Sequence, residues 1–200
     1  MIKTTAMLLH ELGQLYAWPA HKLNRKVKSG ELIPIVKGLY EDDSSVPGYL
    51  LAGSIYGPSY LSFEFALSFY GMIPEAVYTF TSATYDKKKK KMYETPFGSF
   101  SYRDVPPSVY PLEIRLKHEG DYYFQIASPE KALCDQLYAL PPVKNQKELQ
   151  KLLFEDLRID LEQYDKLDFD TLVSLSDEYH TTNLKLLNRF ARRRCNEHNY

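Results

Sequence analysis

The sequence predicts an α+β protein in three parts: a small N-terminal unit of two helices and a hairpin, a larger mixed α/β domain, and a helical C-terminal tail. Two helical patterns followed by short β runs predict the first part. Alternating β-rich and helical segments as far as Pro142 predict the second, and leucines at helical spacing after Pro142 predict the third. The polar, acidic stretch 41–45 indicates a linker. We therefore expect boundaries at 1–45, 46–142 and 143–200.

Residues 4–13 and 19–29 predict two consecutive helices. Pro19 suits the first turn of the second helix and Gly30 suits its C-terminal exit. Apolar residues recur on one side of this helix at spacings of three and four, which predicts a buried face. That face would carry Ala20, Leu23 and Val27.

Two short β runs follow within residues 32–40, around a tight turn at Lys37 and Gly38. Pro34 is acceptable there only on an edge strand. A helix, a second helix and a small hairpin occur in this order in a winged helix-turn-helix, which we predict for residues 1–45.

The middle domain should contain helices at 47–55 and after Ser62, and a further helix whose start is marked by Ser128, Pro129 and Glu130. Residues rich in β-formers predict its strands at 76–82, 91–94, 98–103 and 122–127. This alternation predicts a mixed sheet covered by helices.

Charge is distributed unevenly along the chain. Its 200 residues carry a net charge of −1. Residues 1–40 hold six lysines and arginines against two glutamates, a net +4, which leaves −5 for the rest. A basic head on an acidic body suggests that the head meets a polyanion.

The compartment is predicted to be the cytoplasm, with no membrane contact. The N-terminal apolar run is broken by His10 and Glu11, unlike a signal peptide, and no stretch approaches the roughly 20 apolar residues of a membrane span. The two cysteines, Cys134 and Cys195, cannot form a disulfide framework.

The second helix presents polar and basic side chains away from its apolar face, as a DNA-recognition helix does. Arginine can bind guanine and asparagine can bind adenine through paired hydrogen bonds, whereas a lysine at the hairpin turn would contact phosphate. The candidate DNA-binding residues are Lys22, Asn24, Arg25, Lys26, Lys28 and Lys37. The alternative is a basic helix face that is simply solvated.

A run of five lysines is a second candidate basic patch. It comprises Lys87, Lys88, Lys89, Lys90 and Lys91. Adjacent lysines can bind phosphates without reading sequence, but we favour a solvated turn between strands, with contact to an acidic protein surface as an intermediate alternative.

The sequence does not favour an enzyme, a cofactor or a metal site. Its five histidines are scattered without metal-ligand spacing. A nuclease site built on Asp104, Glu113 and Arg115 would lack the usual lysine, for which a guanidinium is a poor substitute. Glu130, Lys131 and Asp135 could suggest an acid–base site, but helix capping explains Ser128, Pro129 and Glu130 more simply.

Three segments together resemble the AbiEi-type antitoxins of bacterial type IV toxin–antitoxin (abortive infection) systems. These are Ser29–Tyr40, which ends in Gly-Leu-Tyr, Tyr60–Pro74, and Ile126–Asp135 with its Ser-Pro-Glu-Lys-Ala-Leu string. Their order and spacing match over about residues 1–140, and the helical tail lies outside the pattern.

The resemblance implies an N-terminal winged helix-turn-helix that represses its own operon by binding double-stranded DNA at the promoter. It also implies a C-terminal domain that counteracts a nucleotidyltransferase-like toxin. Two alternatives stay open: a protein-interaction module whose winged helix does not bind DNA, and a metal-dependent nuclease.

Overall fold

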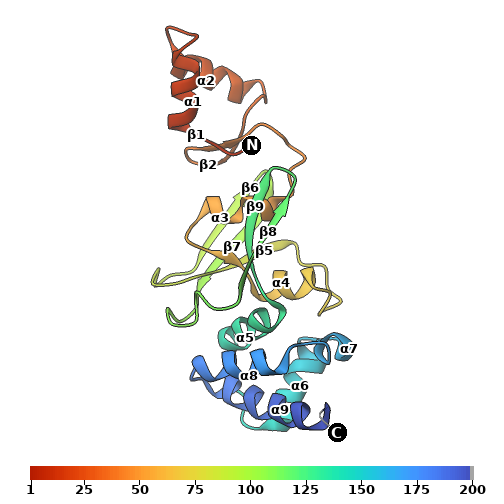
Figure 1. Ribbon diagram of the computed structural model, residues 1–200. Helices are drawn as coiled ribbons and strands as arrows, with labels where there is room; N and C mark the ends of the chain where they lie inside the picture. Colours follow the sequence, from red (N-terminus) through yellow and green to blue (C-terminus); the bar gives the residue numbers. More distant parts are fainter. Residues whose placement is uncertain (199–200) are drawn as a thin grey trace.

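The computed structural model describes residues 1–198, with side chains as far as Arg194, and has mixed α+β architecture. Figure 1 shows three layers stacked along one axis: an N-terminal unit at one end, a sheet in the middle and a group of helices at the other end.

The N-terminal unit consists of two helices beside a small antiparallel sheet of order β1-β3-β2. Its elements are β1 (Lys3–Thr4), α1 (Thr5–Gly13), α2 (Pro19–Lys28), β2 (Ile33–Val36) and β3 (Leu39–Glu41). The two predicted helices and the hairpin are therefore present. Pro34 lies on the edge strand β2, as expected, because an edge strand has a free side where no N–H donor is needed.

A small core of its own holds this unit together. Leu8 and Leu12 of α1 pack with Leu23 of α2 and with Leu32 ahead of the hairpin, and all four are buried. Ala20 is exposed, contrary to our expectation. It lies one turn before Leu23, in the first turn of α2.

The middle layer is a mixed six-stranded sheet of order β6-β7-β5-β4-β9-β8 within the described residues. The strands are β4 (Tyr60–Leu61), β5 (Thr79–Thr84), β6 (Lys91–Thr95), β7 (Gly98–Asp104), β8 (Ile114–Glu119) and β9 (Tyr122–Ala127). The four strands that the sequence predicts correspond to β5, β6, β7 and β9. The central strand β4 is only two residues long, and it pairs with β9 at a single position, Leu61 with Ile126.

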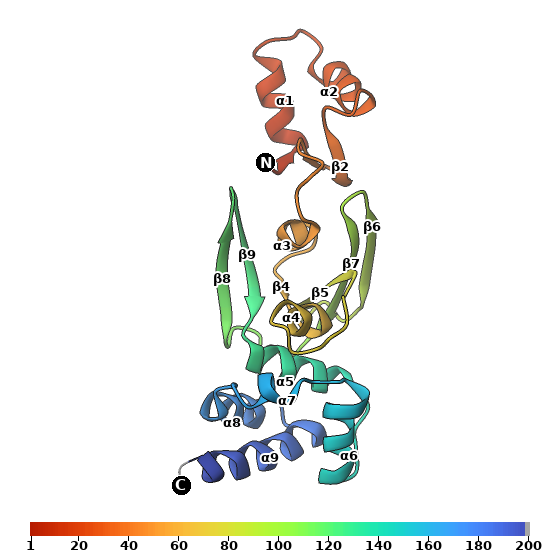
Figure 2. The same ribbon diagram turned by 90° about the vertical axis from the view of Figure 1, so that its right-hand side faces the viewer.

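Because β4 is so short, the sheet is joined only at its lower end. Figure 2 shows the β8–β9 hairpin and the β5–β7–β6 strands splayed apart, with a short helix between them. That helix is α3 (Ala52–Ile55), preceded by the 3₁₀ turn η1 (Gly48–Leu51). The predicted helix at 47–55 therefore exists as two short helical segments, which lie between the two halves of the sheet.

Helices cover the lower end of the sheet and form the tail (Figure 2). They are α4 (Phe63–Phe69), α5 (Pro129–Ala139), α6 (Gln146–Lys151), the π-helical segment η2 (Leu152–Asp156), α7 (Leu161–Tyr164), α8 (Phe169–Glu178) and α9 (Thr182–His198). Ser128 caps α5 by accepting a hydrogen bond from the Lys131 backbone N–H, as its sequence predicted. Ser62 precedes α4 but makes no such cap, because its hydroxyl is used elsewhere in the core.

A continuous core joins the sheet to the tail. Phe100 and Ile126 of the sheet, Leu133 of α5 and Leu172 of α8 all belong to one buried cluster. Among the described residues, no helix combines the length and the apolar character needed to cross a bilayer.

Candidate nucleic-acid interface

The helix α2 carries all but one of the candidate DNA-binding residues. Leu23 and Val27 anchor the helix against the small core, and they fix which side chains point away from it. Pro19 begins the helix, where its missing N–H costs no hydrogen bond. The basic segment is thus helical, and its register is set by the core.

Three of the predicted DNA-binding residues project freely from α2. Asn24, Arg25 and Lys28 are exposed. No ion pair to a described acidic side chain neutralises Arg25 or Lys28. These side chains can therefore bind a polyanion without first breaking an ion pair.

Lys22 and Lys26 are more constrained than the sequence suggested. The Lys22 ammonium lies 5.1 Å from the centre of the Tyr16 ring, a cation–π geometry. The Lys26 ammonium donates to Glu31 at 2.8 Å. This hydrogen bond raises the pKa of Lys26, and the same contact lowers the pKa of Glu31. The pair is solvated and its strength is modest, but it directs Lys26 toward the hairpin.

Lys37 is exposed in the turn between β2 and β3, away from the start of α2. The Gly38 carbonyl accepts a hydrogen bond from the Thr5 N–H at 3.0 Å, which holds this turn against the beginning of α1. Lys37 and the connection between α1 and α2 therefore lie at opposite ends of α1. Lys37 therefore lies apart from Lys22 and Arg25, and the three do not form one cluster.

Sequence reasoning missed the aromatic side chains beside the basic face. Tyr16 and Trp18 lie in the connection between α1 and α2, and His21 follows one turn after Trp18. Trp18 and His21 meet edge to face with ring centroids 6.4 Å apart. The signal was present in the spacing: Trp18, His21, Lys22 and Arg25 stand at i, i+3, i+4 and i+7, which is one side of a helix.

The lysine run lies in a different part of the molecule, between β5 and β6. Lys88, Lys89 and Lys90 are exposed, while Lys87 donates to the Gly57 carbonyl. The Lys88 backbone N–H donates to Asp104 at 2.6 Å. This turn is therefore fixed by its backbone, with three ammonium groups in solvent, and it does not extend the α2 surface.

The carboxylates considered for a nuclease are not brought together. Asp104 ends β7 whereas Glu113 and Arg115 lie at the start of β8, and β5, β4 and β9 separate these two strands. Asp104 accepts hydrogen bonds from Thr84 and from the Lys88 backbone. Among the side chains that the structure describes, as far as Arg194, no group of three or more His, Cys, Asp or Glu is placed to hold a metal ion.

The residues of the Ser-Pro-Glu-Lys string form a buried polar network. Lys131 and Asp135 are both fully buried, one helical turn apart on α5, with 3.4 Å between ammonium and carboxylate. Tyr179 donates to Asp135 and accepts from Lys131. Burial lowers the pKa of Lys131.

The sheet contributes two further donors to the same carboxylate. Tyr60 and Ser62 both donate to the second oxygen of Asp135, at 3.0 and 2.6 Å, and Lys131 also donates to the Val109 carbonyl. Asp135 therefore joins β4, α5 and the end of α8 through hydrogen bonds. Since its members are buried, this network acts as a structural tie.

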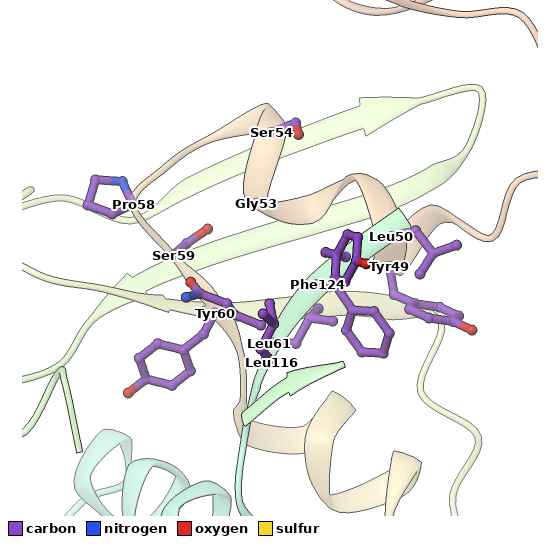
Figure 3. Close-up of a pocket in the computed structure, with 12 residues that line it drawn as sticks. Tyr49, Leu50, Gly53, Ser54, Pro58, Ser59, Tyr60, Leu61, Leu116 and Phe124 are labelled. Atoms are coloured by element: carbon purple, nitrogen blue, oxygen red, sulfur yellow. The ribbon is translucent and has the colours of Figure 1, made fainter. Parts of the chain in front are cut away.

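A cavity of about 310 Å³ lies between α3 and the β8–β9 hairpin. Figure 3 shows Tyr49 and Leu50 at one end, and Pro58, Ser59 and Tyr60 at the other. The cavity lies beside β4, where this strand is too short to pair with β9 along its whole length. It carries no cluster of acidic or basic side chains, so it does not compete with α2 as a polyanion site.

Comparison with known protein families finds no family that matches this chain, and comparison with curated proteins finds no significant match either. The features of this chain that indicate a function are therefore the surface of α2 and the three segments of its sequence.

Proposed function

We propose that this protein is a DNA-binding transcriptional regulator that uses residues 1–45 as a minimal winged helix-turn-helix. The observation that carries the proposal is the outward face of α2. There Asn24, Arg25 and Lys28 are exposed on a helix whose opposite side is anchored by Leu23. A helix with free basic and amide groups on one side can enter the major groove and bind phosphates and base edges together.

The arrangement around α2 supports this proposal. The strand order β1-β3-β2 places a hairpin directly after the helix, with the exposed Lys37 at its turn. One helix precedes α2 in the unit, so this version of the motif is short. In it, α1 would cross the backbone of the DNA and α2 would read the groove.

We further propose that the protein represses its own promoter and acts as an antitoxin against a nucleotidyltransferase-like toxin. This part depends on the three segments that resemble the AbiEi-type antitoxins. Two of them, Tyr60–Pro74 and Ile126–Asp135, supply the buried tie between β4 and α5. These segments would thus maintain the domain that meets the toxin, rather than contact the toxin themselves.

The test is binding of the promoter fragment of its own gene, measured by fluorescence anisotropy across a range of salt concentrations. Replacing Arg25 and Lys28 by alanine should weaken binding and flatten the plot of log K against log salt by about 0.9 per lost phosphate contact. Lys147→Ala on α6, an exposed lysine in the tail, is the matched control and should leave both unchanged. Equal binding by the double variant and the parent would exclude α2 as the DNA-binding helix.

A protein-interaction module is the second candidate, and it has its own support. Leu116 and Tyr123 project from the β8–β9 hairpin with 66% and 68% of their surface exposed. Apolar groups that are exposed side by side mark many interaction surfaces. Co-expression with the product of the neighbouring gene, followed by size-exclusion chromatography, tests this function separately from DNA binding.

A further inference from the structure

The connection between α1 and α2 lies at the tip of the molecule (Figure 1). It exposes large apolar side chains. Trp18 is 75% exposed, Leu15 77% and Tyr16 43%. The backbone here is held in place, because the N–H groups of Leu15 and Tyr16 both donate to the Leu12 carbonyl. The rings are thus presented by a closed turn, and nothing in the N-terminal core requires them.

These rings share one hollow with the cations of α2. A concavity of about 300 Å³ is lined by Tyr16, Trp18, His21, Lys22 and Arg25, together with Ala17. The edge-to-face contact of Trp18 with His21 and the position of the Lys22 ammonium over Tyr16 tie the turn to the helix. Aromatic faces and positive charges therefore line a single surface.

The chemistry of that surface favours a nucleic-acid strand as its occupant. Sugars and bases offer apolar edges and π-faces, and each is flanked by a phosphate. An apolar protein surface would cover the rings, but it would leave Lys22 and Arg25 desolvated without an anion. An anionic lipid surface also combines apolar and negative groups, but it has no use for the exposed amide of Asn24 on the same helix.

We propose that Trp18 and Tyr16 form an aromatic clamp that packs on the sugars and base edges of one DNA strand, beside the base pairs read by α2. In this arrangement Lys22 and Arg25 bind the phosphates of that strand. This inference rests on the proposed function, because it places the clamp at the edge of the same interface. The clamp adds an apolar contribution to DNA binding, beside the electrostatic contribution of the basic side chains.

The chain contains a single tryptophan, so its fluorescence reports on this turn alone. Addition of the promoter duplex should quench Trp18 emission, and the quenching should saturate at the same concentration as anisotropy of the labelled duplex. Vesicles of phosphatidylserine and phosphatidylcholine serve as the competing probe and should leave the emission unchanged. Quenching by vesicles but not by the duplex would overturn the inference.

Variants separate the clamp from the charges. Trp18→Ala should weaken duplex binding at least about fivefold, with Trp18→Phe within about twofold of the parent, since a phenyl ring retains the apolar contact. The slope against salt should stay the same in both, because no phosphate contact is lost. Tyr78→Ala, which removes another highly exposed ring from the body of the molecule, is the control and should bind like the parent.

The outcomes distinguish this inference from the function beneath it. If the parent binds the promoter duplex and Trp18→Ala binds equally well, the clamp is wrong and the regulator stands. If the parent itself fails to bind, the proposed function and the clamp are both wrong.

Discussion

At the scale of single residues, the pair Lys131 and Asp135 shows how a motif can have a structural role. The two charges are fully buried on α5, and hydrogen bonds from Tyr60, Ser62 and Tyr179 satisfy the carboxylate. A buried pair of this kind adds little net stability compared with apolar residues, but it becomes costly when one partner is removed. It therefore specifies how α5 sits between the sheet and the tail.

Replacement of Asp135 by asparagine should lower the free energy of unfolding by about 3–5 kcal/mol, because it leaves the Lys131 ammonium buried without a counter-charge. Urea unfolding followed by circular dichroism measures this change. Asp177→Asn is the control: Asp177 pairs with Arg192 in solvent, and its loss should cost less than about 1 kcal/mol.

A double variant identifies the cause. Lys131→Met combined with Asp135→Leu removes both charges and should be more stable than Asp135→Asn alone. If the double variant is the less stable of the two, hydrogen bonding rather than charge burial governs this site.

At the scale of elements, the sequence predicts those helices and strands whose bounds are set by residues close to them in the chain. The helix α5 begins where Ser128 and Pro129 place it, and the strand β9 has the bounds that its β-formers indicated. The N-terminal helices and hairpin also follow from local signals. These elements need no information from the rest of the chain.

Elements set by distant contacts escaped prediction. The strand β4 is two residues long, and only its neighbours β5 and β9 make it a strand. Ser62 looks like a helix cap in sequence, yet its hydroxyl donates to Asp135, 73 residues away. Tyr16 was missed for another reason, because it belongs to the turn and joins the face of α2 only in three dimensions.

The hairpin of the N-terminal unit depends on a single backbone conformation. Gly38 has φ +86°, and a Cβ there would meet the Thr5 hydroxyl at 3.6 Å, an ordinary contact. The strain of Gly38→Ala is therefore conformational, about 1–2 kcal/mol. We expect faster amide hydrogen exchange in β2 and β3 of this variant.

Gly13 provides the matched substitution. It ends α1 with no atom within 4 Å of an added Cβ and has no positive φ. Gly13→Ala should leave exchange in the hairpin unchanged. Equal acceleration in both variants would mean that the hairpin does not depend on the left-handed turn.

At the scale of the whole molecule, tyrosine couples the fold to alkaline pH. Burial raises the pKa of Tyr49 and Tyr110 to about 12. Burial also raises the pKa of a further group of tyrosines in the body: Tyr60, Tyr70, Tyr102, Tyr122 and Tyr179. In the unfolded chain each of these groups would titrate near 10.

The sign of the pH dependence follows from that difference. Because the folded-state pKa lies above the unfolded value, these tyrosines give their full stabilisation below pH 10, and it is lost as the pH rises through 10 toward the folded values. Lys131 acts in the opposite direction, since its pKa is lowered by burial. It contributes one group against seven, so the melting temperature should fall steadily between pH 9.5 and pH 11, a range bracketing the unfolded tyrosine pKa of about 10.

Absorbance at 295 nm, which reports tyrosinate, supplies the independent measurement. In folded protein at a pH just above the reference value of about 10, the tyrosinate signal should be well below that of the urea-unfolded chain and should rise to it on unfolding. Tyr102→Phe removes one group whose hydroxyl donates to the Ala52 carbonyl, and should reduce the steepness of the fall in melting temperature. Equal tyrosinate signals in the folded and unfolded protein would mean that the aromatic core is open to solvent. The packing between the sheet and the helices described above would then be wrong.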